Sequence, residues 1–344
     1  MIALRIGILN GGGDCAGLNA VTRGVLRGAE EYGMEVLAIR NGWAGLLEGK
    51  AQPVRYSDFE ELIGTGGTAL FTSRTNPLKR SDGLQTVASN VKKLGLDCLI
   101  AVGGDDTLGV ASALAGLGIN VIGVPKTIDN DLAGTDYSFG FFTAVDEAMH
   151  LIESLRTTGL SHGRVMVVEV MGRDAGWISA YAGIAAGANM VIVPEFQTQL
   201  SDVVDLVRKR HSEGKRGTVV VVAEGVKLIS REGTDRDEFG HELIAKAAGE
   251  SNASVLAKYI EEKTGLETRA TVLGHTIRGT SPNAYDRVMT TMLGFRAAAA
   301  AKERRFGIMV AIRGACIEEV PLAEGSKKKY MDSATWSVLS RFFV

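Results

Sequence analysis

Three short segments combine glycine with charged residues, and each directly follows an apolar run. Their sequences are GGGD at 11–14, GGDDT at 103–107 and PKTIDND at 125–131. Clustered glycines let a backbone approach an anion closely, whereas carboxylates hold divalent cations and accept protons. Phosphate binding, charge neutralisation and a general base are what phosphoryl transfer requires. The three segments therefore predict phosphoryl-transfer chemistry.

The first segment predicts a phosphate site. Gly11, Gly12 and Gly13 precede a helix that we expect over 19–32. Backbone N–H groups at a helix N-terminus attract anions, because the positive end of the helix dipole lies there. A tight turn that binds nothing is the alternative, but three adjacent glycines cost backbone entropy, which favours the phosphate site. The spacing is not that of a Walker A loop.

The second segment places two acids at a turn before a helix expected over 107–117, with Thr107 as its cap. Carboxylates beside a phosphate site require an intervening cation, and Mg²⁺ is the usual one. The alternative is that Asp105 and Asp106 are helix-capping residues, which remains a serious competitor for one of them.

The third segment contains acidic residues and a lysine, and its sequence has no helical period. Lys126, Thr127 and Asp129 follow a strand, and Asp131 and Asp136 come shortly after them. An acidic stretch of this kind can be a solvated connection between elements. The alternative, which we favour, is that one aspartate is the base for an acceptor hydroxyl and the lysine neutralises the phosphoryl group.

Apolar patterning indicates the elements that position these segments. Runs typical of strands buried on both faces occur at 4–9, 35–39, 98–102, 120–124, 165–170, 190–193 and 218–222. Helical spacing occurs at 19–32, 107–117, 143–155 and 201–211. This alternation predicts a doubly wound α/β fold, in which ligands bind beyond the carboxyl ends of the strands. The three segments fall at such ends.

Composition and charge restrict the class of function. The chain has 344 residues, of which 45% are hydrophobic and 23% charged, as in proteins with a buried core. Its formal net charge of −2 gives no general attraction to nucleic acid or anionic membranes. No apolar stretch approaches the roughly 20 residues that span a bilayer, and we expect no signal peptide. We therefore expect no nucleic-acid partner and no membrane partner.

Three further features carry weaker expectations. Cys15, Cys98 and Cys316 are far apart, so we expect reduced thiols and a cytoplasmic protein. The polar stretch 227–241 is expected to be a surface loop before a helix over 243–263. The basic run 327–329 is expected to be a solvated surface feature.

Six motifs, taken together and in order, resemble those of phosphofructokinases. They are GGGDCAGLN, GGDDT, PKTIDND, Met171-Gly172-Arg173, ETRA at 267–270 and GHTIRG at 274–279, and they cover roughly residues 5 to 282. The resemblance implies two doubly wound, mainly parallel α/β domains with the active site in the cleft between them. It implies a domain for the phosphoryl donor and Mg²⁺ at 1–140 plus about 277–325. The sugar-phosphate domain would comprise 141–276 plus about 326–344.

The resemblance also implies a role for each matched residue on the donor side. Gly12 and Arg74 would hold the donor phosphates, and Asp105 would coordinate the Mg²⁺ cofactor. Asp129 would take the proton from the 1-hydroxyl of fructose 6-phosphate, with Lys126 and Thr127 acting on the transferred phosphoryl group. The product would be fructose 1,6-bisphosphate, a glycolytic intermediate.

On the sugar side the resemblance implies a second group of residues. Those lining the sugar would be Met171, Gly172, Arg173 and Glu224. His275 and Arg278 would hold the 6-phosphate, and Arg164 and Arg269 would reach that phosphate from a neighbouring subunit. The protein is therefore expected to be a homo-oligomer, either a dimer or a tetramer.

Three residues bear on the identity of the donor. ATP-using members of the family usually carry glycine where Asp106 stands, and often where Lys126 stands. An aspartate there occupies space that a nucleotide needs and repels its α-phosphate. Thr75 also stands where ATP-using relatives often place an aromatic residue. We therefore expect pyrophosphate as a reversible donor, with ATP as the alternative.

Other functions explain only part of this pattern. NAD kinases and diacylglycerol kinases carry a similar Gly-Gly-Asp turn, but that resemblance leaves PKTIDND and the 171–173 motif unexplained. A non-catalytic sugar-phosphate sensor could use the arginines, but it has no need of Asp129 beside Lys126. Sedoheptulose 7-phosphate remains open as a further acceptor.

Overall fold

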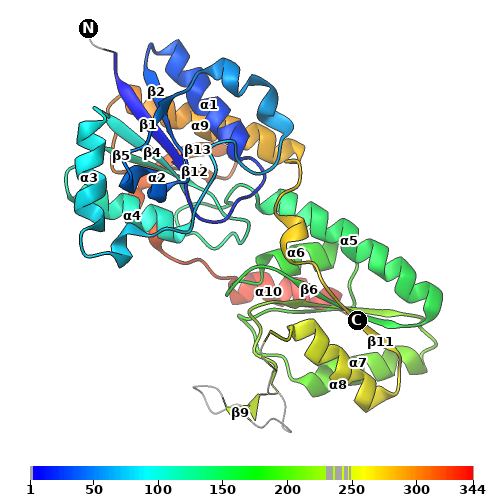
Figure 1. Ribbon diagram of the computed structural model, residues 1–344. Helices are drawn as coiled ribbons and strands as arrows, with labels where there is room; N and C mark the ends of the chain where they lie inside the picture. The colour runs from blue at the N-terminus through cyan, green and yellow to red at the C-terminus, as the bar shows by residue number, and fades with distance from the viewer. Residues whose placement is uncertain (1–2, 230–234, 237–241, 244–246, 248, 344) are drawn as a thin grey trace. The chain divides into compact units, whose positions relative to one another are not determined.

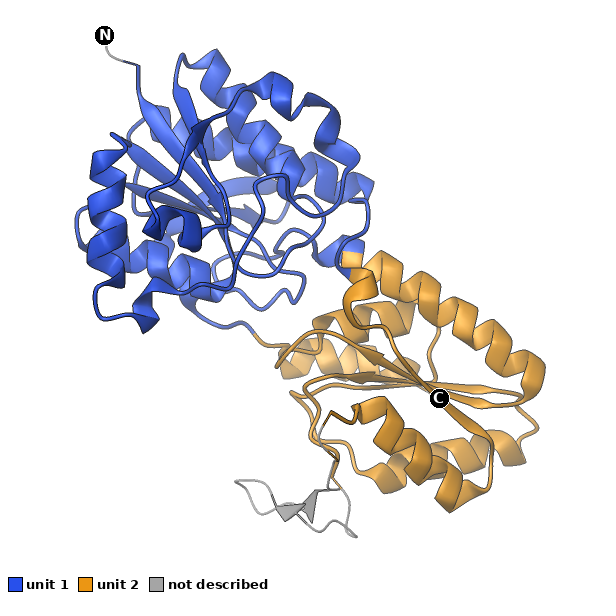
Figure 2. Cartoon of the chain, viewed as in Figure 1, with its two compact units in different colours: residues 1–143, 278–329 blue, residues 144–277, 330–344 orange. Residues whose placement is uncertain are grey.

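The chain forms two compact units, shown in separate colours in Figure 2. The computed structural model describes residues 3–229, 235–236, 242–243, 247 and 249–343. Unit 1 comprises residues 1–143 and 278–329, and unit 2 comprises residues 144–277 and 330–344. The sequence predicts that the chain passes from one domain to the other near residues 140, 276 and 325. The assignment of donor and sugar binding to separate domains, and of an active site to the cleft between them, stays a prediction.

Unit 1 is built on a seven-stranded sheet. In spatial order its strands are β13 (Cys316–Pro321), β12 (Ile308–Arg313), β5 (Val121–Pro125), β4 (Cys98–Gly103), β1 (Arg5–Asn10), β2 (Glu35–Ile39) and β3 (Gln52–Pro53). The five inner strands are parallel, and only the edge strands β3 and β13 are antiparallel to their neighbours. Strands β4 and β5 are buried along their whole length, as expected of a parallel sheet covered on both faces.

Helices cover both faces of this sheet (Figure 1). One face carries α1 (Leu18–Glu31) and α9 (Ala284–Lys302), and the other carries α2 (Trp43–Leu47), α3 (Gly83–Lys93) and α4 (Asp105–Gly116). Glycines let the backbones of α1 and α9 pack in direct contact. A Cβ added to Gly24 would lie 2.3 Å from the carbonyl oxygen of Thr291, and one added to Gly294 would lie 2.1 Å from that of Val21.

Unit 2 is built on a smaller, wholly parallel sheet. Its strands in spatial order are β11 (Thr268–Val272), β6 (Val165–Val170), β8 (Thr218–Ala223) and β7 (Met190–Ile192). One face packs against α7 (Leu200–Ser212) and α8 (Asn252–Thr264), and the other lies against α5 (Phe141–His162) and α6 (Trp177–Ala185) (Figure 1). Unit 2 also contains the two-stranded pair β9 (Asp235–Arg236) and β10 (Glu242–Leu243), and the helix α10 (Ser333–Leu339).

The predicted fold class is confirmed, with differences at some element ends. All seven predicted strands form within one residue of their expected bounds. The helix predicted over 143–155 continues to His162, and the one predicted to begin at Leu243 begins at Asn252. Ser251 starts that helix, because its hydroxyl accepts the N–H of Ser254 at 3.1 Å. Most of the predicted surface loop 227–241 lies outside the described residues. Among the described helices, none is long and apolar enough to cross a membrane.

A buried carboxylate holds the start of α5. The side chain of Asp286 is fully buried, and its two oxygens accept the N–H groups of Gly140 and Thr143, each at 3.0 Å. Asp286 lies on α9, so it caps a helix other than its own. The cap therefore ties α9 to the point where the chain leaves unit 1.

Replacing Asp286 by alanine is expected to lower the free energy of unfolding by about 2 kcal/mol, because two buried N–H groups lose their acceptor. Urea unfolding measured on both proteins checks this value. The matched control is Asp332→Ala, which removes the exposed cap that accepts the N–H of Thr335 at 2.8 Å and should lower the free energy of unfolding by much less. An equal loss in both variants would show that burial of the cap is irrelevant.

Candidate active site

The glycine loop at 11–14 does not present the bare N–H groups that the sequence suggested. The N–H of Gly11 donates to Val102 and that of Gly12 to Ser73, both at 2.9 Å to carbonyl oxygens. Helix α1 begins only at Leu18, so the loop is not its first turn. The predicted mechanism of phosphate binding is therefore wrong for these two groups, because the fold already uses them. A role of Gly12 in donor binding stays a prediction.

Two cations lie against this loop instead. The ammonium of Lys126 donates to the carbonyl oxygen of Gly13, and a guanidinium nitrogen of Arg278 donates to that of Asp14 at 3.0 Å. Gly12 has a φ of +82°, and a Cβ added to it would lie 3.5 Å from the Lys126 nitrogen. A Cβ on Gly13 would lie 2.7 Å from Arg278. Gly12 is favoured by its positive φ, and a side chain at position 13 would displace the Arg278 guanidinium from the loop.

Burial distinguishes the Lys126 ammonium from a surface lysine. The residue is 3% exposed, and removal from water lowers its pKa below the ordinary value, with the nearby Arg278 guanidinium acting in the same direction. A positive charge that is poorly solvated by water interacts strongly with an incoming anion. Positive charge at this loop therefore comes from its two cations rather than from its amides.

The two acids of the second segment occupy the first turn of α4, whose N-cap is Gly104. The predicted Thr107 cap is wrong: Thr107 is buried, and its side chain fills the space above Gly103 and Gly11, where an added Cβ would lie within 2.5 Å of it. Negative charge is favourable at this end of a helix. Asp105 and Asp106 are therefore both stabilised by the helix, whatever else they bind.

Asp105 and Asp106 have different partners within unit 1. An oxygen of Asp105 lies 2.9 Å from the ammonium of Lys328. An oxygen of Asp106 accepts the side-chain N–H of Asn76 at 3.1 Å. Asn76 follows Arg74, which is exposed, and the segment before it pairs with Gly12 through Thr72 and Ser73. Asp106 is thus tied to the segment that carries Arg74.

The third segment is buried, which excludes a solvated connection. Asp129 and Asp131 are each 4% exposed and Asn130 is 1% exposed. The backbone N–H of Asp129 donates to the Thr127 hydroxyl at 3.1 Å. Asn130 has a φ of +52°, an unusual conformation that its side-chain oxygen supports by accepting the N–H of Ser138 at 3.1 Å. A buried and conformationally strained loop of this kind is typical of a functional site.

The basic run 327–329 is not the solvated feature that its composition suggested. Lys327 is exposed and pairs with Glu324 at 2.7 Å, as a surface lysine does. Lys328 instead contacts both Asp105 and Asp131. The Lys329 ammonium donates to the Asn130 side chain at 3.1 Å, and burial lowers its pKa to about 8. Two of the three lysines therefore belong to the acidic loop.

In unit 2, Glu224 organises the turn formed by the 171–173 motif. One of its carboxylate oxygens accepts the N–H of Gly172 at 3.2 Å and that of Arg173 at 2.7 Å. Arg173 has a φ of +52°, and Gly225 is required beside it, because an added Cβ would lie 1.9 Å from the Arg173 carbonyl oxygen. Met171 is half-buried at the start of the turn.

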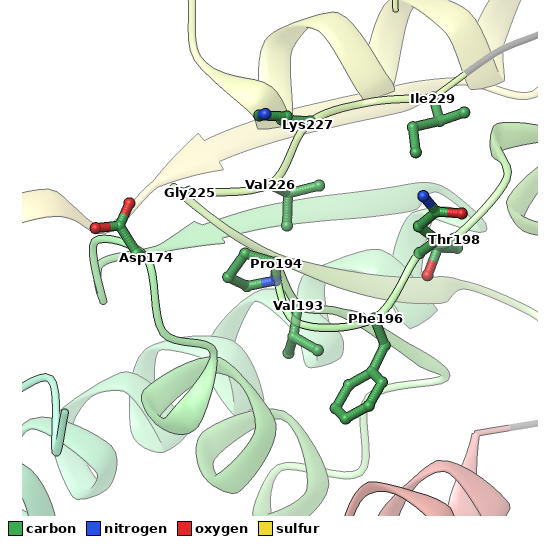
Figure 3. Close-up of a pocket in the computed structure, with 10 residues that line it drawn as sticks. Asp174, Val193, Pro194, Phe196, Thr198, Gly225, Val226, Lys227 and Ile229 are labelled. Carbon is green, nitrogen blue, oxygen red and sulfur yellow. The ribbon is translucent and has the colours of Figure 1, made fainter. Parts of the chain in front are cut away.

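A cavity of about 310 Å³ opens beside this turn. Its lining includes Asp174 and Gly225, the residues that directly follow Arg173 and Glu224. Figure 3 shows the segments 193–198 and 225–229 facing one another, with Pro194 and Val226 between them. These segments follow β7 and β8, so the cavity lies at the carboxyl ends of the strands. Its volume is at the lower end of the range for small-molecule sites.

The remaining predicted sugar residues lie elsewhere in the chain. Arg164 and Arg269 both contact Glu267, with 2.8 Å between the Arg164 Nε and a Glu267 oxygen. The structure thus gathers these two arginines around one carboxylate. His275 is exposed in the short 3₁₀ turn Gly274–Ile277 of unit 2, whereas Arg278 belongs to unit 1.

The fold and these motifs can be compared with those of known proteins. Residues 5–301 match the family described as Phosphofructokinase. The chain belongs to the phosphofructokinase family. It is 49% identical to the pyrophosphate--fructose 6-phosphate 1-phosphotransferase of Amycolatopsis methanolica, with 94% of each chain covered. It is 44% identical to the ATP-dependent 6-phosphofructokinase 3 of Streptomyces coelicolor, with 93% of this chain and 94% of that one covered.

Solved structures agree with this assignment. The chain superposes on the phosphofructokinase of Pichia pastoris with a TM-score of 0.84 at 28% identity. The match covers 100% of this chain, which spans only 37% of the yeast chain. The predicted family resemblance is thereby confirmed. Relatives of both donor types occur at similar identity, so overall similarity discriminates poorly between donors.

Three residues in these arrangements were not singled out from the sequence. Asn76 contacts Asp106, Lys328 contacts Asp105, and Glu267 contacts Arg164 and Arg269. Only Glu267 had a visible signal, since it stands inside the ETRA motif. Asn76 and Lys328 reach their partners from positions 30 and more than 200 residues away in the chain, which no local pattern reveals.

Proposed function

We propose that this chain transfers a phosphoryl group reversibly between pyrophosphate and the 1-hydroxyl of fructose 6-phosphate. The observation that carries the choice of donor is Asp106 in the first turn of α4, with its carboxylate bonded to Asn76. That carboxylate would occupy space that a nucleotide needs and would repel its α-phosphate. Lys126, buried against Gly13, supplies fixed positive charge for a small, densely charged donor.

Mg²⁺ fits the acids present in unit 1. The part of the chain that the structure describes contains no group of three or more His, Cys, Asp or Glu residues placed to hold a metal. Mg²⁺ commonly takes one or two protein carboxylates and completes its shell with water and substrate phosphates. Asp105, partly exposed at the N-terminus of α4, suits this role. The bound ion would neutralise charge on the diphosphate.

Asp129 is proposed as the base that accepts the proton of the sugar's 1-hydroxyl. The loop that carries Asp129 is held by the Thr127 hydroxyl, by the Asn130 side chain and by Lys329, which bonds Asn130. This support favours a defined orientation of Asp129. Lys126 and Thr127 would stabilise charge on the phosphoryl group as it moves. In the reverse direction Asp129, carrying the proton, would return it to the sugar oxygen.

Unit 2 would supply the sugar site. The turn held by Glu224 and the cavity beside Asp174 support binding of a small polar molecule there. Arg164, Arg269, His275 and Arg278 are proposed for the 6-phosphate, with the first two acting in a neighbouring subunit of a dimer or tetramer. ATP as donor remains the second candidate, favoured by the ATP-dependent relative. A cytoplasmic location is part of the proposal, and the three cysteines are free thiols.

The reverse reaction tests this function. With fructose 1,6-bisphosphate, Mg²⁺ and labelled orthophosphate, the purified protein should form labelled pyrophosphate. Reversal with pyrophosphate is expected because both directions use the same groups. Formation of ATP in a parallel reaction with ADP in place of orthophosphate, with no labelled pyrophosphate in the first reaction, would overturn the choice of donor.

Glu267→Gln tests the proposed arginine pair. The substitution removes the charge that holds two partly exposed guanidinium groups, and exposed ion pairs contribute little. We therefore expect KM for fructose 6-phosphate to rise about threefold with kcat unchanged. Glu261→Gln, on the exposed face of α8, is the control and should leave both constants unchanged. A fall in kcat at constant KM would instead place Glu267 in the chemical step.

A further inference from the structure

The backbone of Lys328 is fixed beside the acidic loop. The N–H of Ala133 donates to the carbonyl oxygen of Lys327 at 3.0 Å, and the N–H of Lys329 donates to that of Asp131 at 2.8 Å. Lys328 itself pairs with Leu132 as an antiparallel bridge. The segment thus continues the loop as a short two-stranded ladder, which fixes the backbone of Lys328 and directs any change at this residue to its side chain.

The Lys328 ammonium joins two carboxylates of different character. It lies 2.9 Å from an oxygen of Asp105 and also hydrogen-bonds Asp131. The Asp131 side chain is only 6% exposed, whereas that of Asp105 is 26% exposed. A charge as buried as that of Asp131 requires a counter-charge in the protein. The bond to Asp131 is therefore structural, and the bond to Asp105 can be exchanged.

We propose that Lys328 is a positioning residue that competes with Mg²⁺ for Asp105. This inference rests on the proposed role of Asp105 as the metal ligand. The Lys328 ammonium contacts the carboxylate of Asp105, which is the group proposed to bind Mg²⁺. Two cations at one carboxylate repel each other. When Mg²⁺ binds, Lys328 loses its contact with Asp105 and keeps the one with Asp131.

Such competition has a direct consequence for the order of binding. In the free enzyme Lys328 neutralises Asp105 and holds its carboxylate in place. A metal ion that arrives alone must displace this contact without other strong ligands. A metal ion that arrives with diphosphate brings phosphate oxygens that compensate for the displacement. Lys328 therefore favours binding of the metal–donor complex over binding of the metal alone.

The test measures Mn²⁺ binding to the purified protein by electron paramagnetic resonance, without sugar or donor. Lys328→Met should bind Mn²⁺ about tenfold more tightly than the unchanged protein, because a neighbouring positive charge is removed. Lys328→Arg should restore weak binding. Lys327→Met is the matched control, since the ammonium of that exposed lysine pairs with Glu324 rather than with Asp105 or Asp131, and it should change nothing.

A second comparison guards against misfolding of the single variant. Asp131→Asn removes the buried charge that needs Lys328, so the double variant Asp131→Asn with Lys328→Met leaves no uncompensated charge at the buried position 131. It should bind Mn²⁺ about tenfold more tightly than Asp131→Asn alone. Equal or weaker binding in both comparisons would overturn the proposal. Weaker binding of methylenediphosphonate with unchanged Mn²⁺ affinity would also overturn it, by assigning Lys328 to the donor.

The Mn²⁺ measurements and the test of the phosphoryl donor can succeed or fail independently. If Mn²⁺ binding tightens as expected but pyrophosphate is not a donor, the role of Lys328 stands and the donor assignment fails. If pyrophosphate is the donor but Mn²⁺ binding does not respond, the donor assignment stands and the competition is refuted.

Discussion

Asp129→Ser is expected to lower kcat about 10³-fold while leaving the affinity for fructose 6-phosphate nearly unchanged. The carboxylate is proposed to accept the proton of the attacking hydroxyl, and serine cannot do so at neutral pH. Binding should persist, because the groups proposed to hold the sugar phosphate lie elsewhere in the chain. Steady-state kinetics give kcat, and calorimetry with fructose 6-phosphate alone gives the affinity.

The same loop provides a control for this variant. Asp136 is half-exposed, contacts Arg313 and accepts the N–H of Gly314 at 2.7 Å. Asp136→Ser should therefore reduce kcat by less than about twofold, since a surface ion pair contributes little. If Asp129→Ser retained more than a tenth of the original kcat, another group would have to be the base. Loss of sugar binding in the same variant would indicate a structural role instead.

Asp106→Gly is expected to raise kcat/KM with ATP at least about tenfold relative to that with pyrophosphate. The substitution removes both the side-chain volume and the negative charge that are proposed to exclude a nucleotide. It also breaks the hydrogen bond that ties α4 to Asn76. Initial rates with each donor, at equal free Mg²⁺, measure the change.

Asp106→Asn separates the two causes, because it removes the charge and keeps the volume. If repulsion dominates, asparagine should reproduce most of the gain with ATP; if volume dominates, only glycine should. Glycine in the first turn destabilises a helix by about 1 kcal/mol, so thermal unfolding must accompany the kinetics. No gain with ATP in either variant would refute the role of Asp106 in donor choice.

The parallel core of the fold could be predicted from the sequence because its signal is local. Buried strands such as Val165–Val170 and Thr218–Ala223 are continuous apolar runs, and each formed where expected. The parallel strands β11 and β12 and the edge strands β3 and β13 were not predicted. For β13 the reason is that its alternating burial reflects contact with a single neighbour. Helix α8 was predicted too early, because the sequence before Ser251 carries helix-compatible residues that belong partly to β10.

The site was predictable in its residue types but not in its contacts. The acids and glycines of the three segments were found because they follow strands directly. The use of the Gly11 and Gly12 N–H groups by Val102 and Ser73 was not predictable, since it depends on pairing between distant segments. The burial of Lys328 and Lys329 was missed for the same reason. Composition alone makes a run of lysines resemble solvated surface.

The central claim is that pyrophosphate is the phosphoryl donor. The most direct measurement compares the rate of fructose 1,6-bisphosphate formation by the purified protein with pyrophosphate and with ATP, at equal free Mg²⁺ and saturating fructose 6-phosphate. The arrangement of Asp106 and Lys126 predicts rapid turnover with pyrophosphate and at most a trace with ATP. Robust turnover with ATP and none with pyrophosphate would contradict it.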